Sequence, residues 1–86
     1  MGETKQDRLK RLKMRSWRRG IKEMDLILGT YSDTELEGLD ETQLVLYDAM
    51  LSENDHDLYQ WVTGQVETPP EYLELLTTIS KFAFKS

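Results

Sequence analysis

The sequence contains no cysteine and only one histidine. Without cysteine the chain has no disulfide, no thiolate zinc site and no cysteine nucleophile, and its composition suits a reducing compartment. His56 stands between two aspartates. Because no second histidine or cysteine is present to complete a site, we interpret it as a solvated loop residue and expect no metal centre.

Long apolar runs are also missing. No segment approaches the ~18 to 20 apolar residues that a membrane-spanning helix needs. The first residues carry neither the apolar core of a signal peptide nor a transit segment. These absences favour a bacterial cytoplasm, with the mitochondrial matrix as the setting of a trimmed eukaryotic form.

Strand-like alternation and internal repeats are absent, whereas helical periodicity recurs along the chain. The 86 residues are enough for one domain with a thin core. We therefore predict an all-α fold, a small single-domain bundle of four to five short helices over residues 1–86. The polar residues 1–6 are expected to be disordered.

A helical segment is predicted from Arg8 to Leu28. Its apolar residues recur at intervals of three and four and form one stripe, which comprises Met14, Trp17, Ile21, Met24 and Leu28. Gly20 interrupts this segment, so it is either one kinked helix or two helices that meet there. Gly29 follows the last periodic residue and is expected to end the helix, with Ser32 capping a short turn that ends at Gly38.

Three further helix signals follow. Asp40 and Gln43 have the spacing of a capping box. A polar connection over residues 52–57 leads to a short helix that ends at Gly64. Thr68 is the expected cap of a last helix, because two prolines and a glutamate follow it. Tyr72, Leu75, Leu76, Ile79, Phe82 and Ala83 give that helix its apolar face.

Charge is divided unevenly along the chain. Residues 1–22 hold nine of the eleven lysines and arginines and two of the sixteen acids, a net charge of +7, and the remaining residues carry −12. Such asymmetry indicates an oriented electric field and an oriented partner.

The most informative stretch is Arg19-Gly20-Ile21-Lys22-Glu23. A glycine inside a helix costs roughly 1 kcal/mol relative to alanine. On a helix Arg19 and Glu23 would project from one face and bracket bare backbone, which a partner protein could approach closely. The alternative is that Gly20 only separates two helices and that the charged residues form an exposed pair without function.

These residues resemble a known family. Arg19, Gly20 and Glu23 match the Arg-Gly-x-x-Glu signature of the succinate dehydrogenase assembly factors that promote covalent flavin attachment. Arg18 and Asp25 match the flanking positions. A second block is similar as well, with Asp57-Leu58-x-x-Trp61 followed by Gly64 and a proline.

The resemblance implies a five-helix fold and a chaperone rather than an enzyme. The implied partner is the flavoprotein subunit of succinate dehydrogenase, and in some bacteria also that of fumarate reductase. In that family the subunit itself forms the bond to its flavin. The assembly factor acts on FAD attachment in the partner, and since this chain has no glycine-rich phosphate loop we expect no tightly bound cofactor.

We hypothesise that Arg19 and Glu23 make charge-assisted hydrogen bonds to the flavoprotein. Gly20 would let the two backbones come close, and Arg18 and Asp25 would fix the local register. The alternative function is a small nucleic-acid-binding or membrane-surface module that uses the basic N-terminal helix.

Overall fold

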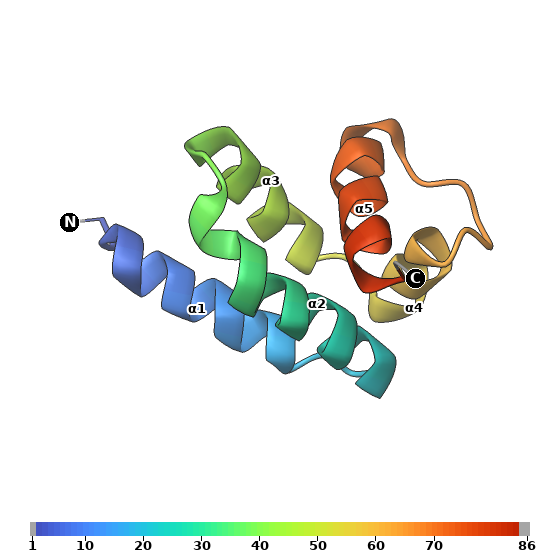
Figure 1. The fold of residues 1–86 in the computed structure, drawn as a ribbon, viewed down its shortest axis with the longest axis horizontal. Coiled ribbons are helices and arrows are strands. Elements are labelled where there is room, and N and C mark those ends of the chain that lie inside the picture. Colours follow the sequence, from blue (N-terminus) through green and yellow to red (C-terminus); the bar gives the residue numbers. More distant parts are fainter. Residues whose placement is uncertain (1, 85–86) are drawn as a thin grey trace.

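The computed structural model describes residues 2–84, which form five α-helices and one short 3₁₀ helix without any strand (Figure 1). The elements are α1 (Lys5–Trp17), α2 (Lys22–Glu35), η1 (Leu36–Gly38), α3 (Glu41–Leu51), α4 (Asp55–Val62) and α5 (Pro70–Ala83). The predicted all-α fold is confirmed.

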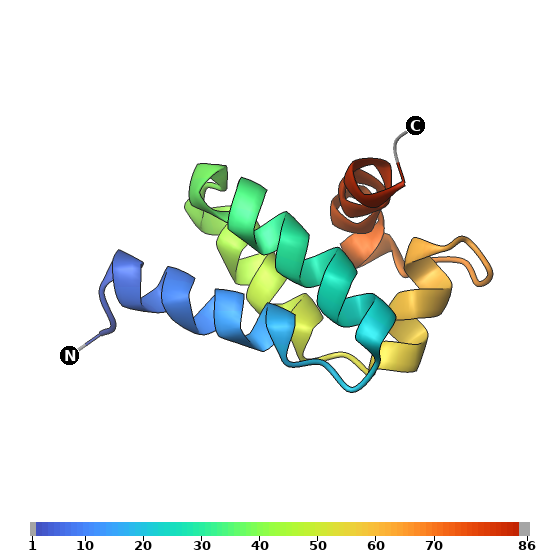
Figure 2. The same ribbon diagram turned by 60° about the horizontal axis from the view of Figure 1, so that its bottom comes forward.

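Helix α2 lies at the centre of the arrangement. It packs against α1, α4 and α5, while α3 contacts both α1 and α5. Figures 1 and 2 show α1 and α2 side by side, with the N-terminal end of α1 at one end of the long axis. The buried core draws on every element and consists of Leu12, Met24, Leu28, Tyr31, Leu36, Leu44, Tyr47, Met50, Leu51, Leu58, Val62, Tyr72, Leu75, Leu76 and Ile79.

The N-terminal segment becomes helical three residues earlier than the sequence predicts. Thr4 caps α1 by accepting a hydrogen bond from the Asp7 N–H at 3.0 Å, and the helix begins at Lys5. Glu3 accepts hydrogen bonds from Arg11. The expected disorder over residues 1–6 stays a prediction, and Met1 lies outside the described residues.

The predicted stripe along the first two helices is wrong in its first half. Met14 and Trp17 are 48% and 39% exposed, whereas Leu12 and Ser16 are buried. The phase changes because α1 ends at Trp17 and α2 begins at Lys22, so the two segments are separate helices with their own inward faces.

Gly29 does not end a helix, and α2 continues to Glu35. A Cβ atom at Gly29 would lie 2.2 Å from Cδ2 of Trp17, so the indole occupies the space that a side chain would need. Ser32 is buried within α2 instead of capping a turn, and its hydroxyl donates to the Gly29 carbonyl at 2.8 Å. Gly29 therefore allows α1 to pack closely on α2. The periodicity of the sequence does not distinguish a glycine with this packing role from a glycine that ends a helix.

The boundaries of α3, α4 and α5 agree with the sequence predictions in some places and differ in others. The Asp40–Gln43 capping box is confirmed. Helix α4 begins at Asp55, inside the expected connection, and Gly64 follows it with a φ of +82° that favours glycine. Thr68 is not the cap of α5, because Pro69 holds that position and the helix starts at Pro70.

Candidate docking loop

The Arg-Gly sequence lies in the loop of residues 18–21, which joins α1 to α2 and which we call the docking loop. Ile21 precedes α2 in an extended conformation, and its carbonyl accepts the first helical hydrogen bond from the Asp25 N–H at 3.1 Å. The Asp25 carboxylate in turn accepts a hydrogen bond from the Arg19 N–H. The first turn of α2 thus fixes the path of the loop that leads into it.

Arg19 points into the molecule. Its Nε donates to Oδ1 of Asp55 at 2.7 Å, and its side chain is only 9% exposed. The guanidinium also donates to the Leu51 carbonyl at 2.8 Å and to the Glu53 carbonyl at 3.2 Å. The cation therefore lies at the carboxyl end of α3 and beside an acidic residue at the amino end of α4, which is where each helix dipole favours that charge.

Gly20 is exposed, and the same aspartate holds it. The Gly20 N–H donates to Oδ2 of Asp55, so one carboxylate binds both the Arg19 side chain and the Gly20 backbone. A Cβ atom at Gly20 would lie 3.2 Å from Oδ2, which is tight, and its outer side is open. The φ of Gly20 is not positive. Its lack of a side chain thus serves close approach to the backbone rather than an unusual turn.

The five predicted site residues divide into two groups. Arg18, Gly20 and Glu23 are exposed, and neither charged side chain forms an ion pair or hydrogen bond with another residue within 2–84. Arg19 and Asp25 are turned inward and hold the loop. The expectation that Arg19 and Glu23 share one helix face is wrong, because Arg19 precedes α2 whereas Glu23 belongs to it.

Asp55 supports the candidate site from inside the molecule, and the sequence did not predict this role. It was assigned to a polar connection beside His56, although an acidic residue after Asn54 is also typical of a helix start. Its carboxylate is 15% exposed and joins residues 35 and 36 positions away. Only the fold brings α4 to the docking loop, so sequence offered a signal for the helix start but none for the contact.

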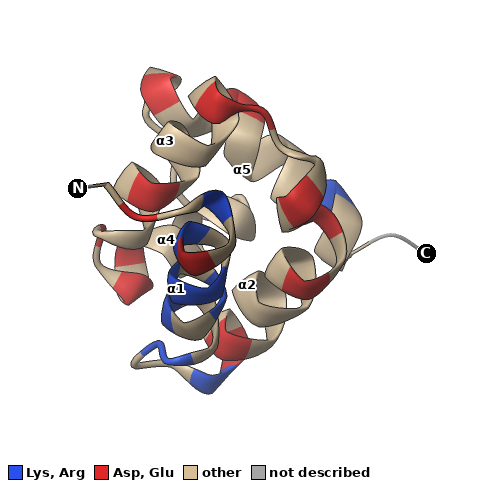
Figure 3. Ribbon diagram, turned by 90° about the vertical axis from the view of Figure 1, so that its left-hand side faces the viewer, with Lys and Arg blue, Asp and Glu red and all other residues tan. Residues whose placement is uncertain are grey.

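Most of the basic charge of α1 is paired within the molecule. At least five cations contact carboxylates: Arg8 with Glu41, Arg11 with Glu3 and Asp48, Lys13 with Glu37, Arg15 with Asp48, and Arg19 with Asp55. Figure 3 shows the basic residues gathered on α1 and the docking loop, with acidic residues on the surrounding helices. Hydrogen bonds from Arg11 lower the pKa of both Asp48 and Glu3.

Other kinds of site find no support in the described part of the chain. Residues 2–84 contain no cluster of three histidine or acidic side chains placed to hold a metal ion. His56 is exposed on α4. None of the helices formed by these residues has both the length and the apolar character that crossing a bilayer requires.

Residues 10–83 match the protein family described as "Flavinator of succinate dehydrogenase". The chain belongs to this family. The match includes the docking loop, Glu23 and Asp55, so the flavinator family covers both the exposed loop and its internal support.

Individual flavinator relatives are similar over most of this chain. "Succinate dehydrogenase assembly factor 2, mitochondrial" from Drosophila grimshawi is 40% identical over 67 residues, which cover 76% of this chain and 46% of the relative. The factor of the same name from Meyerozyma guilliermondii is 39% identical over 69 residues, 80% of this chain and 51% of the relative. "FAD assembly factor SdhE" from Legionella pneumophila (strain Lens) is 40% identical over 62 residues, 72% of this chain and 78% of the relative.

The chain spans about half the length of these two mitochondrial relatives and more than three quarters of the bacterial one. The names therefore include both settings expected from the sequence, a mitochondrion and a bacterium.

Proposed function

We propose that this chain is an assembly factor that binds the flavoprotein subunit of succinate dehydrogenase and promotes covalent attachment of FAD to it. One observation supports this above all: an exposed glycine backbone, flanked by the free charges of Arg18 and Glu23, is braced from behind by Asp55 in a member of the flavinator family. An extension to fumarate reductase stays a prediction.

The proposed role needs a rigid surface rather than reactive groups. Fixing one residue's backbone costs about 1 to 2 kcal/mol of conformational entropy. Because Asp25 and Asp55 already fix the docking loop, that cost does not fall on binding. A factor that holds the flavin-bearing domain in a reactive geometry contributes on the order of several kcal/mol to the rate by positioning alone. It acts on the partner's FAD and holds no flavin tightly itself.

The proposed contacts follow the exposure of the side chains. Gly20 receives the partner's backbone, while Arg18 and Glu23 make charge-assisted hydrogen bonds to it. Arg19 and Asp25 act through the loop and do not touch the partner. This assigns Arg19 a positioning role, in place of the direct contact expected from the sequence.

The nucleic-acid and membrane alternatives are disfavoured by charge. At least five of the nine cations in residues 1–22 are engaged with carboxylates. A polyanion would have to displace those carboxylates and face a chain of net charge −5.

The test combines binding and covalent flavin yield. Purified apo-flavoprotein subunit is incubated with FAD and each variant, and bound flavin is scored by fluorescence in a denaturing gel. Glu23→Ala is compared with Glu71→Ala, since both glutamates are exposed in the first turn of a helix. We expect Glu23→Ala to lower affinity and flavin yield roughly tenfold, the effect of losing a charged hydrogen bond, and Glu71→Ala to change neither.

Gly20→Ala is compared in the same assay with Gly38→Ala, where a Cβ atom meets nothing within 4 Å. We expect loss of binding for Gly20→Ala alone, and urea unfolding verifies that both variants keep the fold. Wild-type protein that neither binds the subunit nor raises its flavin yield would refute the function. Equal behaviour of the two glycine variants would refute the close approach.

A further inference from the structure

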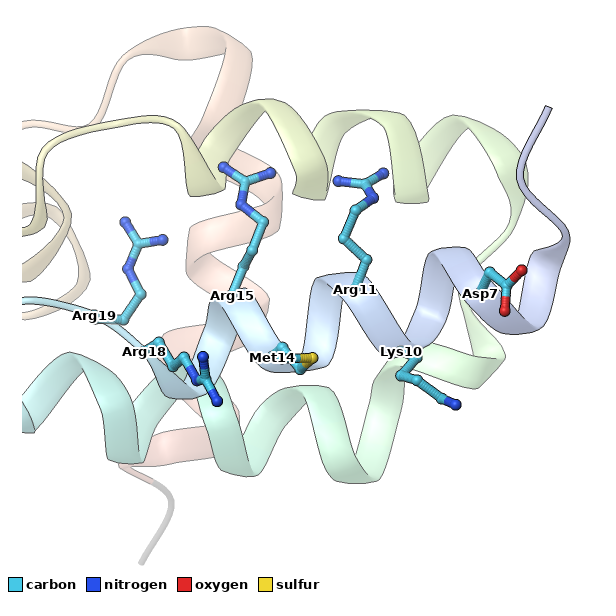
Figure 4. Close-up of a pocket in the computed structure, with 7 residues that line it drawn as sticks. All are labelled: Asp7, Lys10, Arg11, Met14, Arg15, Arg18 and Arg19. Atoms are coloured by element: carbon cyan, nitrogen blue, oxygen red, sulfur yellow. The ribbon is translucent and has the colours of Figure 1, made fainter. Parts of the chain in front are cut away.

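A second exposed feature adjoins the docking loop. Lys10 and Met14 on α1 and Arg18, which directly follows that helix, are spaced by four residues and form what we call the outer row (Figure 4). A surface hollow of about 460 Å³ lies along this row, and its lining also includes Asp7, Arg11, Arg15 and Arg19. Arg18 belongs both to the row and to the docking loop, so the two surfaces are continuous.

The outer row differs from the other basic side chains of α1 in its pairing. Arg11 and Arg15 both contact Asp48 of α3, at 3.1 and 2.6 Å. Lys10 and Arg18 are exposed and form no ion pair or side-chain hydrogen bond with any residue in 2–84. In Figure 4, Arg11 and Arg15 extend toward one side of α1, while Lys10 and Arg18 extend away from them. Folding thus neutralises one side of the helix and leaves the other side charged.

Met14 gives this charged row an apolar centre. Its side chain is 48% exposed, between two cations that lie about 12 Å apart along the helix axis at 1.5 Å per residue. Methionine is unbranched and polarisable and adapts to many apolar surfaces. A complementary partner therefore presents carboxylates at both ends of a segment roughly 12 Å long, with an apolar side chain between them.

We propose that the outer row is a second contact area for the flavoprotein subunit and takes an acidic segment of its surface, with one apolar side chain seated on Met14. This inference rests on the proposed function. An acidic protein segment matches two isolated cations. A nucleic acid carries one charge per about 1.7 Å and would also meet the acidic helices that surround α1 (Figure 3).

The test uses two double variants of equal charge. Lys10→Glu with Arg18→Glu alters the row, and Lys5→Glu with Lys81→Glu alters two exposed lysines elsewhere on α1 and α5. Each pair shifts the formal net charge of the chain from −5 by four units toward the negative, because two cations are replaced by two anions. Association and dissociation rates with apo-flavoprotein are measured by surface plasmon resonance at low and at physiological salt, and circular dichroism verifies the fold.

We expect the row variant to weaken binding about 10- to 100-fold, mainly through slower association that is most marked at low salt. The control variant should change affinity less than about threefold, because distant surface charges are screened. Met14→Ala should weaken binding about threefold to tenfold at both salt concentrations, since apolar burial is not screened.

Equal weakening by both double variants would mean that net charge alone matters, and the inference would be wrong. Unchanged binding of the row variant, while wild type still binds and raises flavin yield, would overturn the outer row and leave the proposed function standing. Row-dependent binding to phosphatidylglycerol vesicles or to duplex DNA, without an effect on the flavoprotein, would assign the row to another ligand. Failure of wild type to bind would remove both proposals.

Discussion

Arg19 and Asp55 meet across 36 positions of sequence, with Nε of Arg19 2.7 Å from Oδ1 of Asp55. The other carboxylate oxygen accepts from the Gly20 N–H, so one side chain of α4 sets both the charge balance and the backbone path of the docking loop. The exposed glycine and the buried ion pair are two sides of a single arrangement.

Arg19→Lys should not behave as a conservative change. The guanidinium donates to Asp55 and to two carbonyls in different directions, and a lysine ammonium cannot reproduce this planar fork. We expect a loss of about 1 to 3 kcal/mol in the free energy of unfolding, measured by urea denaturation. Arg18→Lys is the matched control, because Arg18 is the neighbouring arginine and its side chain is exposed. This variant should change the free energy of unfolding by less than about 0.5 kcal/mol. Similar losses for both variants would contradict the internal role of Arg19.

Asp55→Asn should loosen the docking loop. The amide keeps one acceptor oxygen for two donors and leaves the Arg19 charge without its counterion in a nearly buried position. Breaking such a pair costs about 3 kcal/mol, and amide hydrogen exchange at Gly20 should become faster. Asp57→Asn removes an exposed charge from the same first turn of α4 and controls for the helix dipole. If Gly20 exchange responds equally to both changes, Asp55 does not hold the loop.

Gly29→Ala should displace the Trp17 indole, because the new Cβ atom would lie 2.2 Å from ring carbon Cδ2. Overpacking of this kind costs about 1 to 3 kcal/mol, offset in part by roughly 1 kcal/mol of better helix propensity. We expect a modest loss of stability and a red shift of tryptophan fluorescence. Trp61 is the second tryptophan of the chain, and its emission serves as the reference. In the Trp17→Ala background Gly29→Ala should instead be neutral or stabilising, and additive effects of the two changes would argue against the contact.

Asp48 makes part of the free energy of unfolding depend on pH. Hydrogen bonds from Arg11, with a further contribution from Arg15, hold the pKa of Asp48 below its ordinary value of 3.8 in the folded chain. Because the folded pKa is depressed, the stabilisation is fully present above the unfolded pKa and is lost as pH falls through the folded pKa. Asp48→Asn should lower the free energy of unfolding by about 1 kcal/mol near neutral pH. The difference from wild type should vanish as pH falls through the lowered pKa of Asp48, and a difference that persists once this carboxyl is protonated would exclude this origin.

Ser16 and Tyr47 form a buried hydrogen-bonded pair, and the two hydroxyl groups differ in the other hydrogen bonds that they make. Their hydroxyl oxygens are 2.6 Å apart, and the Ser16 hydroxyl also bonds the Leu12 carbonyl at 2.8 Å. Within residues 2–84, the other hydrogen-bond partner of the Tyr47 hydroxyl is the Leu28 carbonyl at 3.5 Å. Ser16→Ala should therefore cost about 1 to 3 kcal/mol and Tyr47→Phe less. The reverse order in thermal or urea unfolding would show that the tyrosine hydroxyl does not depend on Ser16.

Local patterns predicted the fold class, the Asp40–Gln43 capping box and the inward face of α5, because caps and periodicity act within a few residues. They failed at Gly29, where a contact from another helix decides why glycine is present. They failed in the same way at Arg19, because its side chain donates hydrogen bonds to Asp55 and to the Leu51 carbonyl, which lie more than 30 positions away in the sequence. The sequence indicated that the Arg-Gly stretch matters, but only the packed helices show which of its groups face outward.

The link between Arg19 and Asp55 also bears on biosynthesis. A ribosome completes the Arg-Gly segment 35 residues before it adds Asp55. Until that aspartate emerges and α4 docks, nothing clamps the glycine amide in place. Under the proposed function, an unfinished or truncated polypeptide would lack the ordered docking loop, so we expect binding to the flavoprotein only from molecules that have folded through α4.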